Sequence, residues 1–308
     1  MCIFIISALV FCNSIIKGLS AFELECQDRS SATGLPLCLE ELYKKEVPPF
    51  INNAPVDVSI VVRFDEIIEV NDVDCTVTFN VYLVISWLEP RFKILYNAST
   101  WNSRGTDHMW TNLNVHLLDH IWKPDHDIAN VKKFEIRKVF ERLGGLKLYE
   151  DKRLVYDVNV QITLNCPHFK FDNYPFDTQF CEFSIGSYQW DRRSLLYNGS
   201  MDYNHEHQGP LQYNINSVKS LSFEDSLKGY KGYYYSPNGD LVRFTDVYSH
   251  YTVRMEFSRI LQPHLISTYL PSFLIVLSSW LGFLIGTESI PGRVTVTIVL
   301  LLVIINMR

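Results

Sequence analysis

Strict alternation of apolar and polar residues marks three long segments in the first 260 residues of the chain. The apolar positions of these segments are Val77, Phe79, Val81, Leu83, Ile85 and Trp87, then Val158, Val160, Ile162 and Leu164, and finally Tyr251, Val253, Met255 and Phe257. A period of two indicates β-strands with one buried and one solvated face. Several such strands, separated by turns with Gly, Asn and Pro, predict a mainly β domain, an immunoglobulin-like antiparallel β-sandwich.

The pattern changes to a continuous apolar run at residue 261. Residues 261–286 carry one ionisable side chain, His264. As a helix rising ~1.5 Å per residue, this segment is long enough to cross ~30 Å of hydrocarbon. Pro271 lies within it, and such a kink is tolerated where neighbouring helices cover the freed carbonyl. A polar link precedes a second apolar segment, residues 293–308, which is shorter than the ~20 residues of a full crossing. We therefore expect α-helical transmembrane segments over 260–308, the second one incomplete.

The beginning of the chain predicts export. Residues 1–20 contain a short apolar stretch followed by small residues, which is typical of a secretory signal peptide rather than a membrane anchor. Residues 21–259 then form one extracellular domain, which starts with a charged, proline-containing helix or loop up to about residue 56. Asn97 and Asn198 each begin an Asn-x-Ser sequon, so both are candidate glycosylation sites.

Five cysteines remain after removal of the signal peptide, an odd number for an exported protein. Cys166 and Cys181 are the pair we expect to be bridged. They enclose a loop with Tyr174-Pro175-Phe176-Asp177 at its tip. Cys26 and Cys38 are a plausible second pair. Cys75 is left over, and the period of two predicts a buried thiol on the apolar face of the strand that follows.

Charge and motifs argue against nucleic-acid binding and catalysis. The formal net charge is −6, and no basic stripe is present. His116 and His120 are four residues apart, but we expect a strand there, and the Glu of a zinc protease is absent. His205 and His207 lie in a polar loop and are expected to be solvated. No nucleophile, phosphate-loop or Cys-x-x-Cys motif occurs, so we expect no enzyme activity, no metal and no cofactor.

Several motifs resemble, in the same order, landmarks of the Cys-loop family of pentameric neurotransmitter-gated ion channels. They are Trp87-Leu-Glu-Pro-Arg91-Phe92; Trp122-Lys123-Pro124-Asp125 with Asn130 and Lys132; the Cys166–Cys181 loop with Gln179; Arg259; Tyr269-Leu-Pro271-Ser272 with Ser279-Trp280; and Pro291-Gly-Arg293-Val. The resemblance extends from about residue 57 to the end of the chain. One departure is the loop between the cysteines, which has fourteen residues where the family usually has thirteen.

The resemblance implies a ligand pocket between subunits, lined by aromatic rings that attract a cationic amine. Tyr82 matches the aromatic position of the complementary side, and Tyr188 matches the second loop of the principal side. Phe244, Tyr248 and Tyr251 fall where the third principal loop closes over the ligand. Trp122, by contrast, is expected to pack in the core.

The absence of arginine from two positions narrows the class of ligand that the resemblance implies. Members that bind amino acids carry arginines where this chain has Val84 and Asn159. This favours an amine such as dopamine, tyramine, serotonin or acetylcholine over GABA, glycine or glutamate. No vicinal cysteine pair occurs between residues 230 and 255, which argues against the nicotinic α-subunit type. A subunit that binds no ligand would show the same absences.

In the second apolar segment, one helix face carries Thr295, Val299, Leu302 and Asn306. The resemblance implies that this face lines the pore, with Leu302 as a hydrophobic gate and Arg293 as a ring at the cytoplasmic mouth. Cation-selective relatives place Glu directly before this basic residue, whereas this chain has Gly292 after a Pro, as in the anion channels of invertebrates. Anions are therefore favoured. The alternative is that Pro-Gly-Arg merely caps a membrane helix.

The resemblance also implies an ion pair between Asp177 and Arg259 that couples the pocket to the pore. We therefore expect a subunit of a homo- or hetero-pentameric channel in the plasma membrane, with a postsynaptic location as one option and with its N-terminal domain extracellular. It would be amine-gated and chloride-selective, with a chain that ends inside its second membrane helix. The alternative is a short, membrane-tethered isoform that sequesters transmitter or interferes with the assembly of full-length subunits.

Overall fold

The computed structural model describes residues 37–39, 43–50, 54–94, 102–103, 109–138, 143–203, 212–284, 286, 288 and 290–306. The predicted signal peptide, Cys26, Asn97, His205 and His207 lie outside the described residues.

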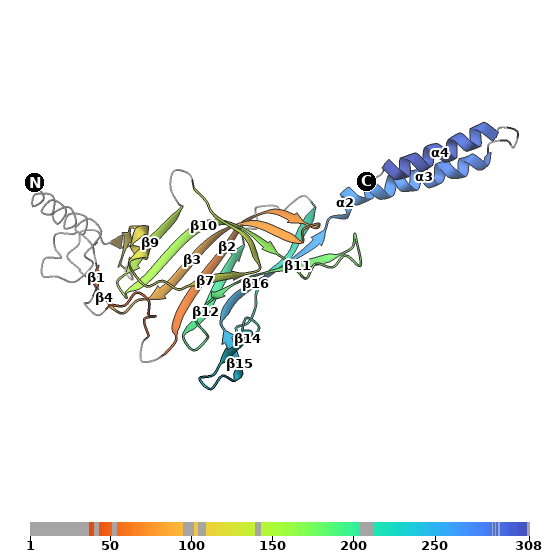
Figure 1. Cartoon of the computed structure of the whole chain (residues 1–308). Coiled ribbons are helices and arrows are strands. Elements are labelled where there is room, and N and C mark those ends of the chain that lie inside the picture. The colour runs from red at the N-terminus through yellow and green to blue at the C-terminus, as the bar shows by residue number, and fades with distance from the viewer. Residues whose placement is uncertain are drawn as a thin grey trace, which may run out of the picture.

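Two facing sheets form the body of the domain, and a separate hairpin projects from it (Figure 1). The larger sheet has the strand order β12-β2-β3-β10-β9-β6-β5, with β8 also paired to β10, and the smaller sheet has the order β13-β16-β11-β7. Strands β14 and β15 pair only with each other, as do β1 and β4. The strands are β1 (Leu37–Leu39), β2 (Val56–Asn71), β3 (Thr76–Leu88), β4 (Phe92–Ile94), β5 (Asn102–Ser103), β6 (Met109–Leu113), β7 (His126–Ala129), β8 (Val131–Ile136), β9 (Gly144–Tyr149), β10 (Arg153–Asn165), β11 (Thr178–Ser187), β12 (Leu195–Tyr203), β13 (Tyr213–Ser220), β14 (Lys228–Tyr235), β15 (Leu241–Tyr248) and β16 (His250–Arg259).

The predicted alternation is confirmed in all three segments. The apolar positions of β3, β10 and β16 are buried between the two sheets. Phe64, Phe79 and Phe183 form an edge-to-face cluster at the centre, with ring centroids 5.4, 6.0 and 6.3 Å apart. The sandwich class is therefore confirmed. Its core fixes the two sheets relative to each other and so positions the sites described below.

Three local predictions were wrong. Residues 37–39 form strand β1 rather than a helix or loop. The segment with His116 is a 3-10 helix, Val115–Asp119, because the side chain of Asn114 accepts a hydrogen bond from the His116 N–H at 2.9 Å and caps it. Cys75 sits in the turn between β2 and β3 with φ 51°, half-buried, rather than on the apolar face of a strand.

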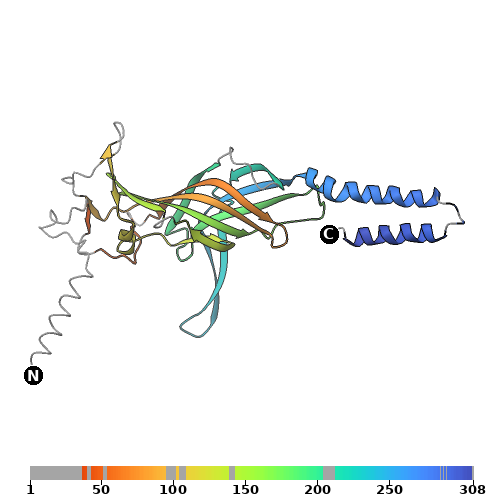
Figure 2. The ribbon, with the colours of Figure 1, turned by 90° about the horizontal axis from the view of Figure 1, so that it is seen from above.

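A helical arm extends from the end of β16 (Figures 1 and 2). It consists of α2 (Leu261–His264), the π-helical turn η3 (Leu265–Tyr269), α3 (Leu270–Leu281), the 3-10 turn η4 (Gly282–Leu284) and α4 (Ile290–Asn306). The π turn ends two residues before Pro271, where the missing N–H and the ring disturb regular α-helical bonding. Helices α3 and α4 lie side by side (Figure 2). Within the described part of the chain, none of the helices has both the length and the apolar character needed to cross a membrane.

Candidate functional site

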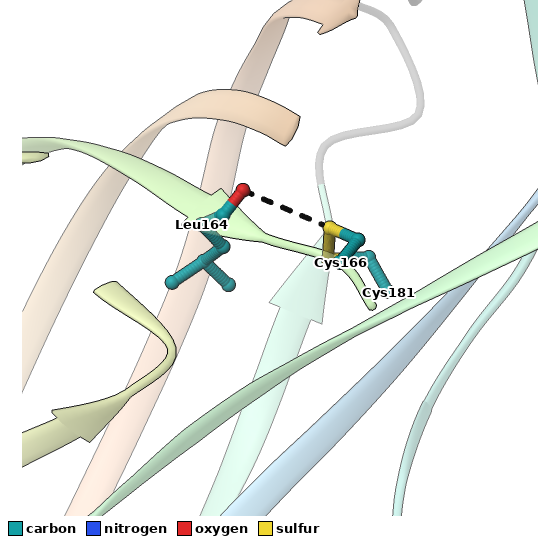
Figure 3. Close-up of a disulfide and its surroundings, with 3 residues drawn as sticks. All are labelled: Leu164, Cys166 and Cys181. Carbon is teal, nitrogen blue, oxygen red and sulfur yellow. Dashed lines mark hydrogen bonds between the residues drawn. A yellow bond between two sulfur atoms is a disulfide. The ribbon is translucent and has the colours of Figure 1, made fainter. Parts of the chain in front are cut away.

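The disulfide predicted between Cys166 and Cys181 is present and joins the end of β10 to β11 (Figure 3). The two Cα atoms are 5.2 Å apart, and both residues are buried. The Cys166 Sγ lies 3.8 Å from the carbonyl oxygen of Leu164, and a dashed line marks this contact in Figure 3. Cys38 is disulfide-bonded as well, and Cys75 is the one free cysteine among the described residues. The bridge closes a loop, here called the Cys loop, whose tip points toward the helical arm.

Arg259, the last residue of β16, is held by two carboxylates, the buried Asp177 and the half-buried Asp72. Its guanidinium donates to both oxygens of Asp177, at 2.8 and 2.9 Å, and to Asp72 at 2.6 Å. Only 1% of the Arg259 side chain is exposed. Gln179 donates a further hydrogen bond to Asp177 at 2.6 Å, and the Tyr213 hydroxyl donates to Asp72. The expected contact between Asp177 and Arg259 is therefore made, in a buried rather than an exposed setting.

Asp72 is the charged member of this cluster that sequence reasoning missed, and Tyr213 was missed as well. Asp72 lies in the turn between β2 and β3, and 187 residues separate it from Arg259. The hydrogen bond from Arg259, together with that from Gln179, holds the pKa of Asp177 below its usual range. The cluster carries one positive and two negative charges, and the hydrogen bond that the Tyr213 hydroxyl donates to Asp72 stabilises this second carboxylate.

The tip of the Cys loop contacts the first turn of the helical arm. The Tyr174 hydroxyl lies 2.9 Å from Nδ1 of His264 in α2, and the two rings meet edge to face at 5.3 Å. The Arg259 guanidinium lies over the same tyrosine ring, 4.8 Å from its centroid. Tyr174 thus links Arg259 and its ion pairs to the helix that follows β16.

At the other end of β11, hydrogen bonds fix the segment that carries Tyr188. Asp125 accepts from the Ser187 hydroxyl at 2.7 Å and from the Gln189 N–H at 2.6 Å. The N–H of Arg192 donates to the carbonyl of Val247 in β15 at 2.9 Å, which ties the segment to the projecting hairpin. Tyr188 itself is 80% exposed. Hydrogen bonds therefore fix the backbone on both sides of this exposed aromatic ring.

The β14–β15 hairpin, here called the aromatic hairpin, carries a group of rings on one face. Tyr248 meets Tyr230 edge to face at 5.3 Å, and Tyr230 is a residue that sequence reasoning missed. Phe244 lies opposite Gly232, and its ring covers the glycine so closely that an added Cβ would lie 2.3 Å from it. Tyr251, the third ring predicted to close over a ligand, lies in the core with 5% exposure, so this position does not support that role. Trp122 is buried against Trp87 at 6.4 Å, as expected of a core residue.

The outer surface of the larger sheet presents Tyr82 in a setting that the sequence did not reveal. Its hydroxyl donates to Asp157 at 2.8 Å, and burial together with this bond raises the pKa of Tyr82 to about 12. The Arg63 guanidinium covers one face of the ring at 4.8 Å and also donates to Asp65 at 2.8 Å. Lys147 lies 3.8 Å from Asp157. One ring face of Tyr82 is therefore already occupied by a cation that has its own carboxylate partner.

Helix α4 packs one side against α3 and turns the opposite side away. A groove of 420 Å³ between them is lined by Arg293, Thr297 and Leu301 of α4, with Ser279 and Phe283 on the other side. Thr295, Val299 and Leu302 are exposed and lie on the side away from α3. Asn306 ends the same helix, and its side chain is outside the described set. The structure thus keeps the predicted pore positions together but places Arg293 toward α3 instead of with them.

Comparison with known families agrees with this geometry. A family model described as the neurotransmitter-gated ion-channel ligand binding domain matches residues 35–256, well over half of the chain. The matched range includes both sheets, the Cys loop and the aromatic hairpin. Domains of this family lie outside the cell, bind a small-molecule neurotransmitter and act in oligomers, and the family consists of ligand-gated channels and not of enzymes. This chain belongs to the family of neurotransmitter-gated ion channels.

Proposed function

We propose that the chain is a subunit of a pentameric, plasma-membrane channel that opens on binding an amine and conducts chloride. The observation that carries the gating proposal is the cluster of the buried Arg259 and Asp177 with the half-buried Asp72. It joins the Cys loop, the β2–β3 turn and the last strand at the point where the helical arm begins. Removing one partner from such a cluster leaves an uncompensated buried charge. The three segments therefore move together or not at all.

The path from ligand to cluster follows a single stretch of chain. Strand β15 of the aromatic hairpin ends at Tyr248, and β16 begins two residues later at His250 and ends at Arg259. A ligand that draws the hairpin toward Tyr188 pulls on β16. Because β16 is paired to β11 from His250 to Ser258, the displacement reaches Asp177 and the Cys loop through the same sheet. The contact between Tyr174 and His264 then passes it to the first helix.

Ring chemistry supports an amine as the ligand. Tyr188, Tyr230, Tyr248 and Phe244 offer ring faces and edges on the principal side, which is the arrangement that attracts a cation. On the complementary side, Arg63 is the cation nearest to Tyr82, but Asp65 already pairs with it. A ligand carboxylate would have to compete with that aspartate. The proposed class is therefore a biogenic amine or acetylcholine.

The helical arm supports a pore in a membrane. Large exposed apolar side chains dominate its surface. Exposing such a large apolar patch to water is unfavourable, which fits a surface that contacts lipid or other helices. The hydroxyls of Ser272, Ser278, Thr295 and Thr297 bond to backbone carbonyls of their own helices, which satisfies them without water. Anion selectivity rests on Arg293 with Gly292, rather than Glu, before it.

Ligand class is tested by displacement binding on membranes of cells that express the chain. Dopamine, tyramine, serotonin and acetylcholine should compete, and GABA, glycine and glutamate should not. Tyr230→Ala should weaken competition about tenfold or more, a loss of about 1.4 kcal/mol. Tyr233 lies on the opposite face of the same strand, so Tyr233→Ala is the matched control and should bind as the parent does. Competition by amino acids alone would reject the amine.

Ion choice is tested in channels that contain this subunit. Deleting Pro291 together with Gly292→Glu should move the reversal potential from chloride toward cations, because carboxylates then join the ring at the pore mouth. An unchanged chloride dependence would reject the role given to the Pro-Gly-Arg segment. Binding without any agonist-evoked current would instead favour the alternative of a ligand-binding isoform that interferes with other subunits.

A further inference from the structure

The sequon at Asn198 lies on strand β12, the edge strand of the larger sheet. Asn198, Gly199 and Ser200 are all exposed, and β12 runs parallel to β2. A Cβ on Gly199 would lie 2.1 Å from the carbonyl oxygen of Ile60, so the two strands approach too closely there for any other residue. Because side chains alternate along a strand, Asn198 and Ser200 both point to the outer surface of the sheet.

The register of the sheet puts Asn198 on the same surface as Tyr82. We call this surface, the outward side of β12, β2, β3, β10 and β9, the Tyr82 face. Residues paired across neighbouring strands point to the same side of a sheet. One row of paired residues runs Asp202, Arg63, Tyr82 and Asn159, and a second row runs Asn198, Ser59, Ser86, Val155 and Lys147. The sequon and the tyrosine of the complementary side therefore share one face.

The distance between Asn198 and Tyr82 is close to the radius of a standard protein interface. Four residues along the strands and two strands across correspond to ~13 Å and ~10 Å, or about 16 Å on the diagonal. A standard interface buries ~800 Å² on each partner, which as a disc has a radius of about 16 Å. An interface centred on Tyr82 therefore has Asn198 at its rim.

The side chains between them suit contact with another protein. Val61 is 38% exposed, and Val84 and Val155 are half-buried beside it on the outward side of the sheet. Ser59 and Ser86 continue the row with small side chains. Small apolar and hydroxyl groups on an otherwise solvated face form a flat surface that a partner covers at little desolvation cost.

We propose that Asn198 carries an N-linked glycan that stands at the rim of the Tyr82 face and restricts the packing of a neighbouring subunit there. The inference rests on the proposed function, in which a second subunit covers this face. A glycan is bulky and strongly hydrated, so burying its attachment point is unfavourable. Its attachment joins the Asn198 Nδ2 to the anomeric carbon of a lipid-linked oligosaccharide, with the lipid pyrophosphate as leaving group and loss of one amide proton. The glycan thus restricts sterically which neighbouring subunits can pack on the Tyr82 face and at which angles.

The experiment uses the full chain, with Asn97→Gln in every sample so that one sequon remains, produced in cells that keep their glycans high in mannose. The folded protein in detergent is compared before and after endoglycosidase H, which leaves a single sugar. Asn198→Gln and Ser200→Ala remove the sequon, and Ser200→Thr keeps it. Mass spectrometry reports the glycan, and light scattering across a dilution series reports the oligomers.

We expect a glycan on the parent and on Ser200→Thr. The protein concentration at which half of the chains are in oligomers should fall several-fold once the glycan is trimmed or its sequon is removed. Four outcomes overturn the inference. The first is an unmodified Asn198, and the second is equal assembly with and without the sugar. The third is Ser200→Thr assembling as Ser200→Ala does, since residue 200 itself would then be the cause. The fourth is a protein that is monomeric in every form, which would also reject the proposed assembly, whereas the other three leave it intact.

Discussion

Single residues in this protein act mainly through burial. Asp177 and Arg259 are both almost fully buried, and each satisfies the other through two hydrogen bonds. A surface pair of the same residues contributes ~0–1 kcal/mol, whereas breaking a buried pair costs ~3–5 kcal/mol. The difference arises because the remaining partner keeps its charge with no water to solvate it.

Asp177→Asn should therefore destabilise the full chain by about 3 kcal/mol at pH 7. The pKa of Asp177 is lowered in the fold by Arg259, so the carboxylate stabilises the fold above its unfolded pKa of ~3.9. This stabilisation is lost as the pH falls through the still lower folded pKa. Melting curves in detergent between pH 7 and pH 3 check this. The difference in stability between the parent and the variant should shrink toward the acid end, and a constant difference would contradict the assignment.

His250 predicts a second pH dependence at a higher range. Burial, aided by the nearby charge of Lys228, lowers the pKa of His250 to about 4. An unfolded histidine has a pKa of ~6.5, so between these values the unfolded chain binds more protons and stability rises with pH. As the pH falls from 6.5 to 4, this group should remove about 3 kcal/mol of stability.

His250→Phe removes the titrating group and keeps a ring of similar size. The melting temperature of this variant should change less than that of the parent between pH 6.5 and 4.5. The same substitution at exposed His116 is the control and should leave the pH dependence of the parent unchanged. Identical pH profiles for His250→Phe and the parent would reject the histidine as the source.

Among the elements, the aromatic hairpin shows how one glycine positions a ring. An added Cβ at Gly232 would lie 2.3 Å from the Phe244 ring, whereas nothing lies within 4 Å of an added Cβ at Gly229 on the same strand. The contact leaves no room for both groups, so the phenylalanine has to leave the face of the hairpin. The two glycines therefore form a matched pair for a mutational test.

Gly232→Ala should weaken agonist binding about tenfold, equivalent to about 1.4 kcal/mol, because the ring that helps to close over the ligand is displaced. Gly229→Ala should bind as the parent does. It should also stabilise the folded protein by ~0.4–1 kcal/mol, because alanine lowers the conformational entropy of the unfolded chain. Displacement binding and melting temperature check the two variants. Equal affinity in both variants would show that the Phe244 ring plays no part in binding.

Elements also show where local pattern reasoning succeeds and where it fails. The Trp87-Leu-Glu-Pro-Arg91 motif lies at the end of β3, as its resemblance predicts, and the structure supplies the reason. Glu89 is fully buried and accepts two hydrogen bonds from Arg91, at 2.7 and 2.6 Å. The strand predicted at His116 is wrong because the Asn114 cap converts this short apolar stretch into a 3-10 helix. Over five residues, the period of apolar positions does not distinguish a strand from a 3-10 helix.

At the scale of the whole molecule, the packing of α3 against α4 decides which face of α4 is available to a pore. Thr295 faces away from α3, and Thr297 lines the groove between the helices. These two residues have the same side chain, and each bonds to a carbonyl one turn earlier. They differ only in the direction that they face.

In channels that contain this subunit, a water-soluble thiol reagent should therefore modify Thr295→Cys much faster than Thr297→Cys when agonist is present. The background carries Cys75→Ser, since Cys75 is the free thiol of the described residues. The loss of current over time gives both rates. Faster reaction at Thr297→Cys would mean that α4 turns its other side to the pore, the side on which Arg293 lies.

The sequence by itself determined the sandwich, the Cys-loop bridge, the helical arm and the family, because alternation, long apolar runs and short motifs are local signals. Only the tertiary structure decided that Asp72 completes the Arg259 cluster, that Arg63 covers Tyr82, and that Asn198 shares the face of Tyr82. Such contacts join segments far apart in the chain, up to 187 residues in the case of Asp72 and Arg259. Their register depends on how every strand between them pairs, and a shift of one residue would turn each of these side chains to the opposite face.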